Sequence, residues 1–195
     1  MRERGWSLPE LLTVMALISL ASLVVVPRAV SLARAGRARA AVREIASELQ
    51  ALRWKSVAGN RGHGLWFSRG ERGWHWYVVR DENGNGLRTA EIRSGVDRTL
   101  SGPHWIEDSV SGAELGFPVD GAFPSIPPRR GEITPLDDPV HFGRSDLISI
   151  SPMGSASSGT LYVTSGRELM ALVLFGPSLR IRVWRFEDRS RTWKG

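Results

Sequence analysis

The sequence predicts an α+β protein, in which a long N-terminal α-helix, transmembrane in its first half, packs on a C-terminal antiparallel β-sheet head. Three observations support this fold class. Residues 6–26 form one apolar run, residues 28–58 stay helix-friendly, and alternating apolar segments begin after Gly62. We therefore expect a short basic segment at 1–5, a transmembrane helix at 6–27, its amphipathic continuation at 28–58 and a β-rich head at 59–195.

The composition limits the classes of function. A chain of 195 residues with 42% hydrophobic residues suggests one folded domain plus an appendage. Because cysteine is absent, disulfides, thiolate metal sites and cysteine nucleophiles are excluded. The net charge is +6, and all 26 basic residues except Lys55 and Lys194 are arginine. This balance is compatible with a nucleic-acid or anionic-lipid partner, and equally with solvated arginine-rich faces.

The apolar run is long enough to span a membrane. About 20 apolar helical residues cover the roughly 30 Å of a bilayer core. Between Trp6 and Val26 the only formal charge is Glu10. A secretory signal peptide fits poorly, because its apolar core is shorter and ends at a small-residue cleavage site. A carboxylate near the end of a membrane helix is costly unless it has a partner or a function.

The segment Gly5-Trp-Ser-Leu-Pro-Glu-Leu-Leu12 resembles the class III signal of type IV pilins and pseudopilins. The resemblance implies that residues 1–5 are a leader peptide, and that a prepilin peptidase cleaves between Gly5 and Trp6 and methylates the new N-terminus. It also implies that Glu10 pairs with the N-terminal amine of a neighbouring subunit during assembly. Trp6 stands where the family usually has phenylalanine. The alternative is a plain single-span anchor in which Glu10 is an interfacial charge.

Beyond Pro27, where we expect a kink, the pattern continues as an amphipathic helix. Val42, Ile45, Leu49 and Leu52 form an apolar stripe, opposite Arg39, Arg43, Ser47 and Gln50. The segment 59–62 (Gly-Asn-Arg-Gly) predicts the helix end, so that one helix of about 80 Å runs from Trp6 to Ala58.

The sequence pattern of the head predicts antiparallel strands. Residues 65–67 and 74–79 flank a Gly-containing turn and predict a hairpin. Further strands are expected at 147–150, 160–164, 169–175 and 180–186, with loops and short strands between 94 and 139. This order is similar to that of the GspH/FimT family, as are residues 159–167 and 179–183. The resemblance implies a pilin-like fold.

Candidate ligand sites are few. Asp81, Asn83 and Asn85 match the first half of a calcium loop, although position 92, where a bidentate glutamate belongs, is isoleucine. A Gly/Asn-rich turn after a strand explains the same residues without metal. The four histidines lack the spacing of a metal site, and residues 154–159 are not a nucleophile elbow. We expect no cofactor, no metal site beyond this open calcium question, and no catalytic residue.

The final strand is the candidate contact surface. Alternation places Arg180, Arg182 and Trp184 on one face and Ile181 and Val183 on the other. Guanidinium and aromatic groups together suit phosphate contacts and base stacking. Members of the GspH/FimT family linked to DNA uptake carry Gly-Arg-x-Arg at their C-terminus, and here Leu179 replaces the glycine. A sheet edge protected by positive charge is the alternative.

Three hypotheses follow. The first is a non-enzymatic minor pseudopilin or pilin of a type II secretion pseudopilus or type IV pilus, which assists assembly initiation or forms the tip. The second is a DNA-binding minor pilin of natural transformation. The third is an unrelated single-span protein with a β domain. Under the first two, we expect a single-pass protein of the bacterial inner membrane with its head in the periplasm. Its partners would be the prepilin peptidase, other pilins or pseudopilins and, in the second hypothesis, DNA.

Overall fold

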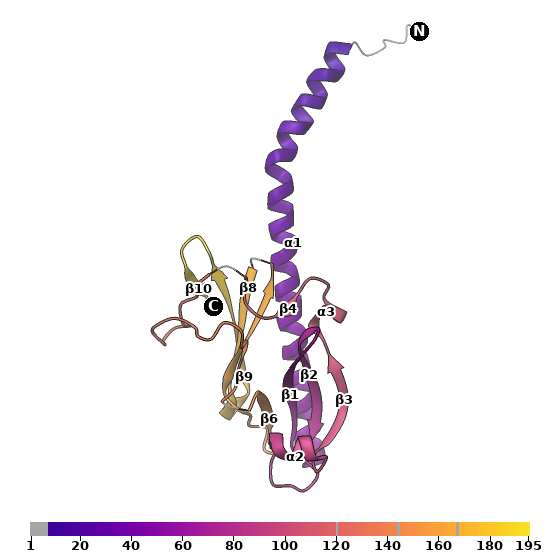
Figure 1. Ribbon diagram of the computed structural model, residues 1–195, viewed down its shortest axis with the longest axis vertical. Coiled ribbons are helices and arrows are strands. Elements are labelled where there is room, and N and C mark those ends of the chain that lie inside the picture. Colours follow the sequence, from indigo (N-terminus) through magenta and orange to yellow (C-terminus); the bar gives the residue numbers. More distant parts are fainter. Residues whose placement is uncertain (1–7, 120, 144, 167) are drawn as a thin grey trace, which may run out of the picture.

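The computed structural model describes residues 8–195 except 120, 144 and 167. It confirms the predicted α+β class: one long helix, α1 (Leu8–Gly59), leads into a head of two antiparallel sheets. Figure 1 shows the first half of α1 projecting away from the head and the second half lying against it. The Trp6 start of the predicted helix lies outside the described residues.

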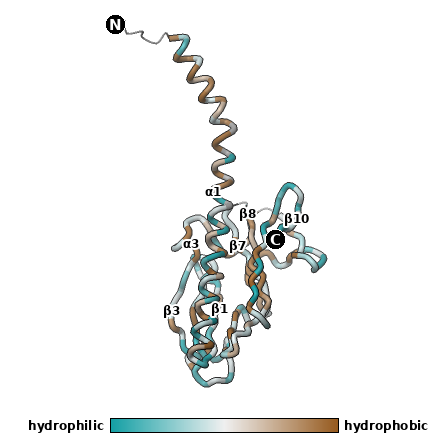
Figure 2. The backbone as a smooth tube through the Cα atoms, turned by 180° about the vertical axis from the view of Figure 1, so that it is seen from behind, coloured by the Kyte–Doolittle hydropathy of each residue, from teal (hydrophilic) through white to brown (hydrophobic). Residues whose placement is uncertain are grey.

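The two halves of α1 differ in what surrounds them. The projecting half is apolar (Figure 2), and an 18-residue window with mean hydropathy 2.1 is wholly unburied. By length and composition this helix can cross a membrane. In the packed half, the predicted stripe of Val42, Ile45, Leu49 and Leu52 is fully buried. Ala38 and Ala41 extend that stripe toward the projecting half.

The helix ends as the sequence predicts, but the deciding residue is an asparagine. Asn60 adopts a left-handed conformation with φ of 48°. The next amide, Arg61 N–H, donates to the Ser56 carbonyl oxygen at 3.2 Å. This is the hydrogen bond of a Schellman motif, which satisfies a carbonyl group at the helix end and turns the chain toward the first strand.

The first sheet has the order β3-β2-β1-β6. The predicted hairpin is confirmed as β1 (His63–Gly70) and β2 (Gly73–Arg80), in which Trp66 lies opposite and stacks on Tyr77. β6 (Leu147–Ile150) has the predicted bounds. The region expected to hold loops and short strands contributes the edge strand β3 (Arg98–His104). It also contains the short helix α3 (Ile106–Ser109).

The second sheet has the order β10-β9-β8-β7-β4, and β5 also pairs with β7. Its long strands lie on the predicted segments that Gly, Pro and Ser residues bound. They are β7 (Gly159–Ser165), β8 (Glu168–Phe175) and β9 (Arg180–Glu187). The shorter strands and connecting helices are β4 (Glu114–Leu115), β5 (Val140–His141), β10 (Thr192–Lys194), α2 (Thr89–Ser94) and the 3-10 turn η1 (Gly176–Ser178).

The central strands β7 and β8 of the second sheet are buried on both faces, which explains the nearly continuous apolar sequence of β8. One face packs on α1, together with the inner face of the first sheet, to form the main core. The opposite face holds a second, aromatic cluster. That cluster joins Tyr162, Leu169, Ala171 and Phe186 of the sheet to Phe123, Ile126 and Ile133 of the covering loop and to Trp193 of β10.

We predict that Leu49→Ala destabilises the head by about 2–5 kcal/mol, because it removes a fully buried side chain where the helix meets the sheets. Denaturant unfolding of the full chain in non-ionic detergent, followed by tryptophan fluorescence, measures this loss. Ser47→Ala, two positions away on the exposed face of α1, is the matched control and should change stability by no more than about 0.5 kcal/mol. Equal effects of the two substitutions would show that the packed stripe does not support the head.

Candidate functional site

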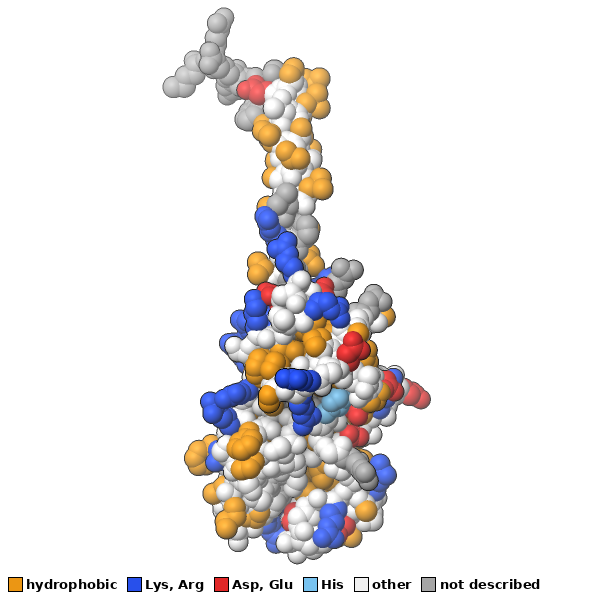
Figure 3. Space-filling view, turned by 90° about the vertical axis from the view of Figure 1, so that its left-hand side faces the viewer, with side chains coloured by type: hydrophobic (Ala, Val, Ile, Leu, Met, Phe, Trp, Pro, Cys, Tyr) orange, Lys and Arg blue, Asp and Glu red, His pale blue; other side chains and the backbone are white. Residues whose placement is uncertain are grey.

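The predicted processing residues, Gly5 and Trp6, lie outside the described residues. The predicted assembly residue, Glu10, lies in the first turn of α1 and is exposed. Apolar side chains surround it along the projecting half, including Leu11, Leu12 and Met15. The one acidic group of this segment therefore lies at the far end of the helix from the head (Figure 3).

The C-terminal candidate residues lie on β9 with the predicted alternation. Arg182 is opposite Val173 of β8, and Trp184 is opposite Ala171. The Arg180 and Arg182 side chains are exposed, and they form no ion pair with any described residue. Two guanidinium groups two positions apart on one face can reach successive phosphates or carboxylates.

Trp184 differs from its two arginine neighbours. It is half-buried and packs against the aromatic cluster on the outer face of the second sheet. A Cβ placed on Gly195 would lie 3.1 Å from the Trp184 ring, so the end of the chain covers part of that ring. The sequence correctly places Trp184 on the arginine face, but its indole contributes to the core as well as to the surface.

The outer edge of β9 is only partly paired. Among the described residues, β10 pairs with Arg185, Phe186 and Glu187, so residues 180–184 form a free edge on that side. Just beyond, Arg185 is held by the Glu168 carboxylate, with its Nη2 at 3.1 Å. Arg180 and Arg182, which form no ion pair with a described residue, thus lie on the part of β9 that has no neighbouring strand on this side. Arg185, which pairs with Glu168, lies on the part that β10 covers.

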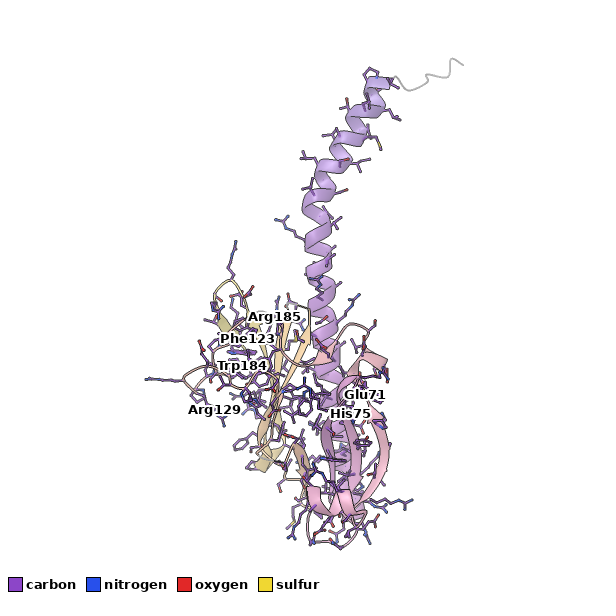
Figure 4. The ribbon with its side chains drawn as sticks, viewed as in Figure 1. Glu71, His75, Phe123, Arg129, Trp184 and Arg185 are labelled. Atoms are coloured by element: carbon purple, nitrogen blue, oxygen red, sulfur yellow. The ribbon has the colours of Figure 1, made fainter. Side chains whose placement is uncertain are left out.

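A groove of about 630 Å³ lies next to these arginines, and no sequence pattern indicates it. Phe175, which is opposite Arg180, lines it and is 57% exposed. Arg129, on the loop that covers the sheet, also lines the groove. Figure 4 shows this loop residue on the outer side of the second sheet. Prolines 127, 128 and 135 and His141 complete much of the lining. The groove brings together residues almost 50 positions apart, so local patterns could not reveal it.

The predicted calcium loop is closed by its own hydrogen bonds. Asp81 is 3% exposed, and its two carboxylate oxygens accept the amides of Gly84 and Gly86 at 2.7 and 2.8 Å. The side-chain amides of Asn83 and Asn85 donate to Glu91, and these hydrogen bonds lower the pKa of that carboxyl. Across the described ranges, no three His, Asp or Glu side chains are grouped to hold a metal.

A second buried carboxylate supports the same loop, and no sequence pattern indicates its role. Asp97 is 1% exposed and accepts the amides of Glu82 at 3.4 Å and Arg88 at 3.3 Å. The loop between β2 and α2 therefore wraps around two aspartates whose oxygens already have backbone donors. Calcium binding at Asp81, Asn83 and Asn85 stays a prediction.

The chain matches no protein-family model, no curated protein and no solved structure. A long apolar N-terminal helix whose second half packs on antiparallel sheets is a pilin-like architecture.

We predict that Asp81→Ala lowers the free energy of unfolding by about 1–3 kcal/mol, because two backbone amides lose their acceptor in a largely buried loop. Thermal unfolding measures the change. Adding calcium to the wild type tests the loop as a metal site, since a ligand that binds the folded state raises the melting temperature. A melting temperature that does not respond to calcium would contradict the calcium prediction. For the stability effect of Asp81→Ala, the milder control is Asn83→Ala, which removes two exposed hydrogen bonds, one to Glu91 and one from the Asn85 amide.

Proposed function

We propose that this protein is a minor pseudopilin or minor pilin of the GspH/FimT family, a non-enzymatic subunit of a type II secretion pseudopilus or a type IV pilus. The observation that carries the proposal is the division of α1 into a bare apolar half and a half buried in the head. A helix divided in this way serves first as a membrane anchor and then as a packing element among other such helices.

Within this proposal, the short basic leader is removed after Gly5 by a prepilin peptidase, and Trp6 becomes the methylated N-terminus. Glu10 then pairs with the terminal amine of a neighbouring subunit. A carboxylate at the apolar end of a helix is stabilised when a cation pairs with it in low dielectric. The protein is a single-pass protein of the bacterial inner membrane with its head in the periplasm, and it acts at the initiation or the tip of the filament.

The second candidate function is DNA capture by a minor pilin of the natural-transformation type. The exposed Arg180 and Arg182 on the free part of β9 favour it, since they offer two positive charges without an ion-pair partner among the described residues. The adjacent Phe175, with 57% of its surface exposed, supplies an aromatic face on which a base can stack.

We predict that co-expression with a prepilin peptidase yields a mature chain that starts at Trp6 and carries an N-methyl group, as read by intact-mass and peptide mass spectrometry. Gly5→Arg should abolish the cleavage, because a long charged side chain replaces the smallest residue at the cleaved bond. Gly5→Ala is the matched control and should still be processed. A wild-type chain that keeps Met1 in the presence of active peptidase would refute the family assignment.

For the second candidate, we predict salt-dependent DNA binding without sequence preference by the full chain in non-ionic detergent, measured by fluorescence anisotropy. Each phosphate contact contributes about −0.9 to the slope of log affinity against log salt. Arg180→Ala with Arg182→Ala should therefore flatten the slope by up to about two. Phe175→Leu and Trp184→Ala should weaken chiefly single-strand binding, by about 1–3 kcal/mol per stacked base.

Arg39→Ala with Arg43→Ala, which removes two exposed charges from α1, is the charge-matched control and should leave the DNA affinity nearly unchanged. Because Trp184 also packs on the aromatic cluster, its variant must be shown to unfold at the wild-type temperature. If the wild type does not bind DNA even at low salt, the second candidate function is refuted. The arginines of β9 would then serve only to protect an open sheet edge against pairing with another chain.

A further inference from the structure

A small pocket on the first-sheet side of the head combines carboxylates with aromatic rings. It has a volume of about 130 Å³ and is lined by residues of α1, β2, the end of β3 and the helix α3. Its principal lining residues are Glu44, Glu48, Trp76, His104, Trp105 and Asp108. We propose that this pocket binds an organic cation, a guanidinium or primary ammonium group.

The carboxylates are the first reason. Glu44 and Glu48 are four residues apart on α1, so they lie on the same face of the helix, where like charges destabilise it. Both residues are only partly exposed, and neither forms an ion pair with a described residue. Asp108 adds a third carboxylate, and its partner Arg72, at 2.8 Å, lies outside the lining. Arg72 thus balances Asp108, whereas Glu44 and Glu48 have no positive partner among the described residues.

The aromatic rings are the second reason. Trp76 is 4% exposed and is fixed in the main core, with its ring centroid 5.8 Å from that of His104. Trp105 already attracts one cation, because the Arg72 guanidinium carbon lies 4.4 Å from its ring centroid. Tryptophan faces bind guanidinium and ammonium groups by cation–π attraction, which strengthens as water is excluded.

The third reason is a hydrogen-bond donor without an acceptor. The Trp105 Nε1 atom is buried and, among the described residues, has no hydrogen-bond partner. A buried donor without an acceptor is destabilising. An arginine or lysine residue carries a cation at the end of its side chain and a carbonyl oxygen on its backbone, so it can supply both a positive charge for the glutamates and an acceptor for Trp105 Nε1.

The shape of the pocket favours an organic cation over a metal ion. Although three carboxylates and a histidine line it, no three such groups in the described part of the chain converge as metal ligands do. A guanidinium or ammonium group on a short apolar stem can instead contact carboxylates on one wall and rings on the other. The cation comes from one of two sources: a side chain of another protein subunit, or a free diamine.

The test uses the full chain in non-ionic detergent and records the indole N–H signals by NMR. The Trp105 signal is assigned through Trp105→Phe, and the probes are N-acetyl-arginine amide, N-acetyl-lysine amide and putrescine. We expect N-acetyl-arginine amide or its lysine counterpart to shift the Trp105 signal saturably, while N-acetyl-citrulline amide, which has a neutral group of the same shape, does not. Stronger binding by the amino-acid amides than by putrescine indicates a side chain of another subunit, and the reverse order indicates a free diamine.

Glu44→Gln with Glu48→Gln should weaken the cation affinity at least tenfold and raise the melting temperature of the free protein, because it removes two unpaired carboxylates. Glu71→Gln with Glu132→Gln, which removes the same charge from exposed positions outside the pocket, should leave the affinity within about twofold. The proposal is overturned if no cation shifts the Trp105 signal, if the citrulline amide binds equally well, or if the control pair weakens binding as much. A lower melting temperature for Glu44→Gln with Glu48→Gln would also overturn it. These outcomes are independent of whether the protein assembles as a pilin.

Discussion

The head depends on one apolar stripe, the face of α1 from Ala38 to Leu52. Both sheets bury their inner faces against this stripe, so neither is a complete layer without the helix. The small residues Ala38 and Ala41 lie at its start, followed by Ile45, Leu49 and Leu52 deeper in the head. The same helix continues outward as a bare apolar segment, so that the anchor and the core are one secondary-structure element.

Much of this arrangement is predictable from local sequence, because it follows from spacing. The stripe from Val42 to Leu52 follows the helical period, and β6 to β9 are short apolar or alternating segments bounded by turn residues. The sequence does not predict β3 as a separate strand, because all of its residues are exposed and show no alternation of apolar and polar residues. Nor could the groove beside Arg180 or the pocket around Trp105 be predicted, because each joins segments far apart in the chain.

The loop between β2 and α2 shows why a motif can suggest two structures. Alternating oxygen-bearing residues with glycines suit a calcium ion, and they also suit a turn that satisfies its own amides. Here Asp81 and Asp97 accept four backbone amides while almost fully buried. The charge pattern is similarly local: a chain of net charge +6 has a basic strand edge at Arg180 and Arg182, and a carboxylate-lined pocket at Glu44 and Glu48.

The unbroken course of α1 also has a mechanical consequence. Its packed half lies lengthwise against β7 and β8 on one side and β1 on the other. A pull on the projecting half along the helix axis therefore loads these contacts in shear. The contacts of all the buried stripe residues then resist at the same time and do not break one after another. The helix has no loop between its two halves that could extend and absorb the force. Tension at the far end is thus transmitted directly to the centre of the head. The contacts with the two sheets together oppose the withdrawal of α1 from the head.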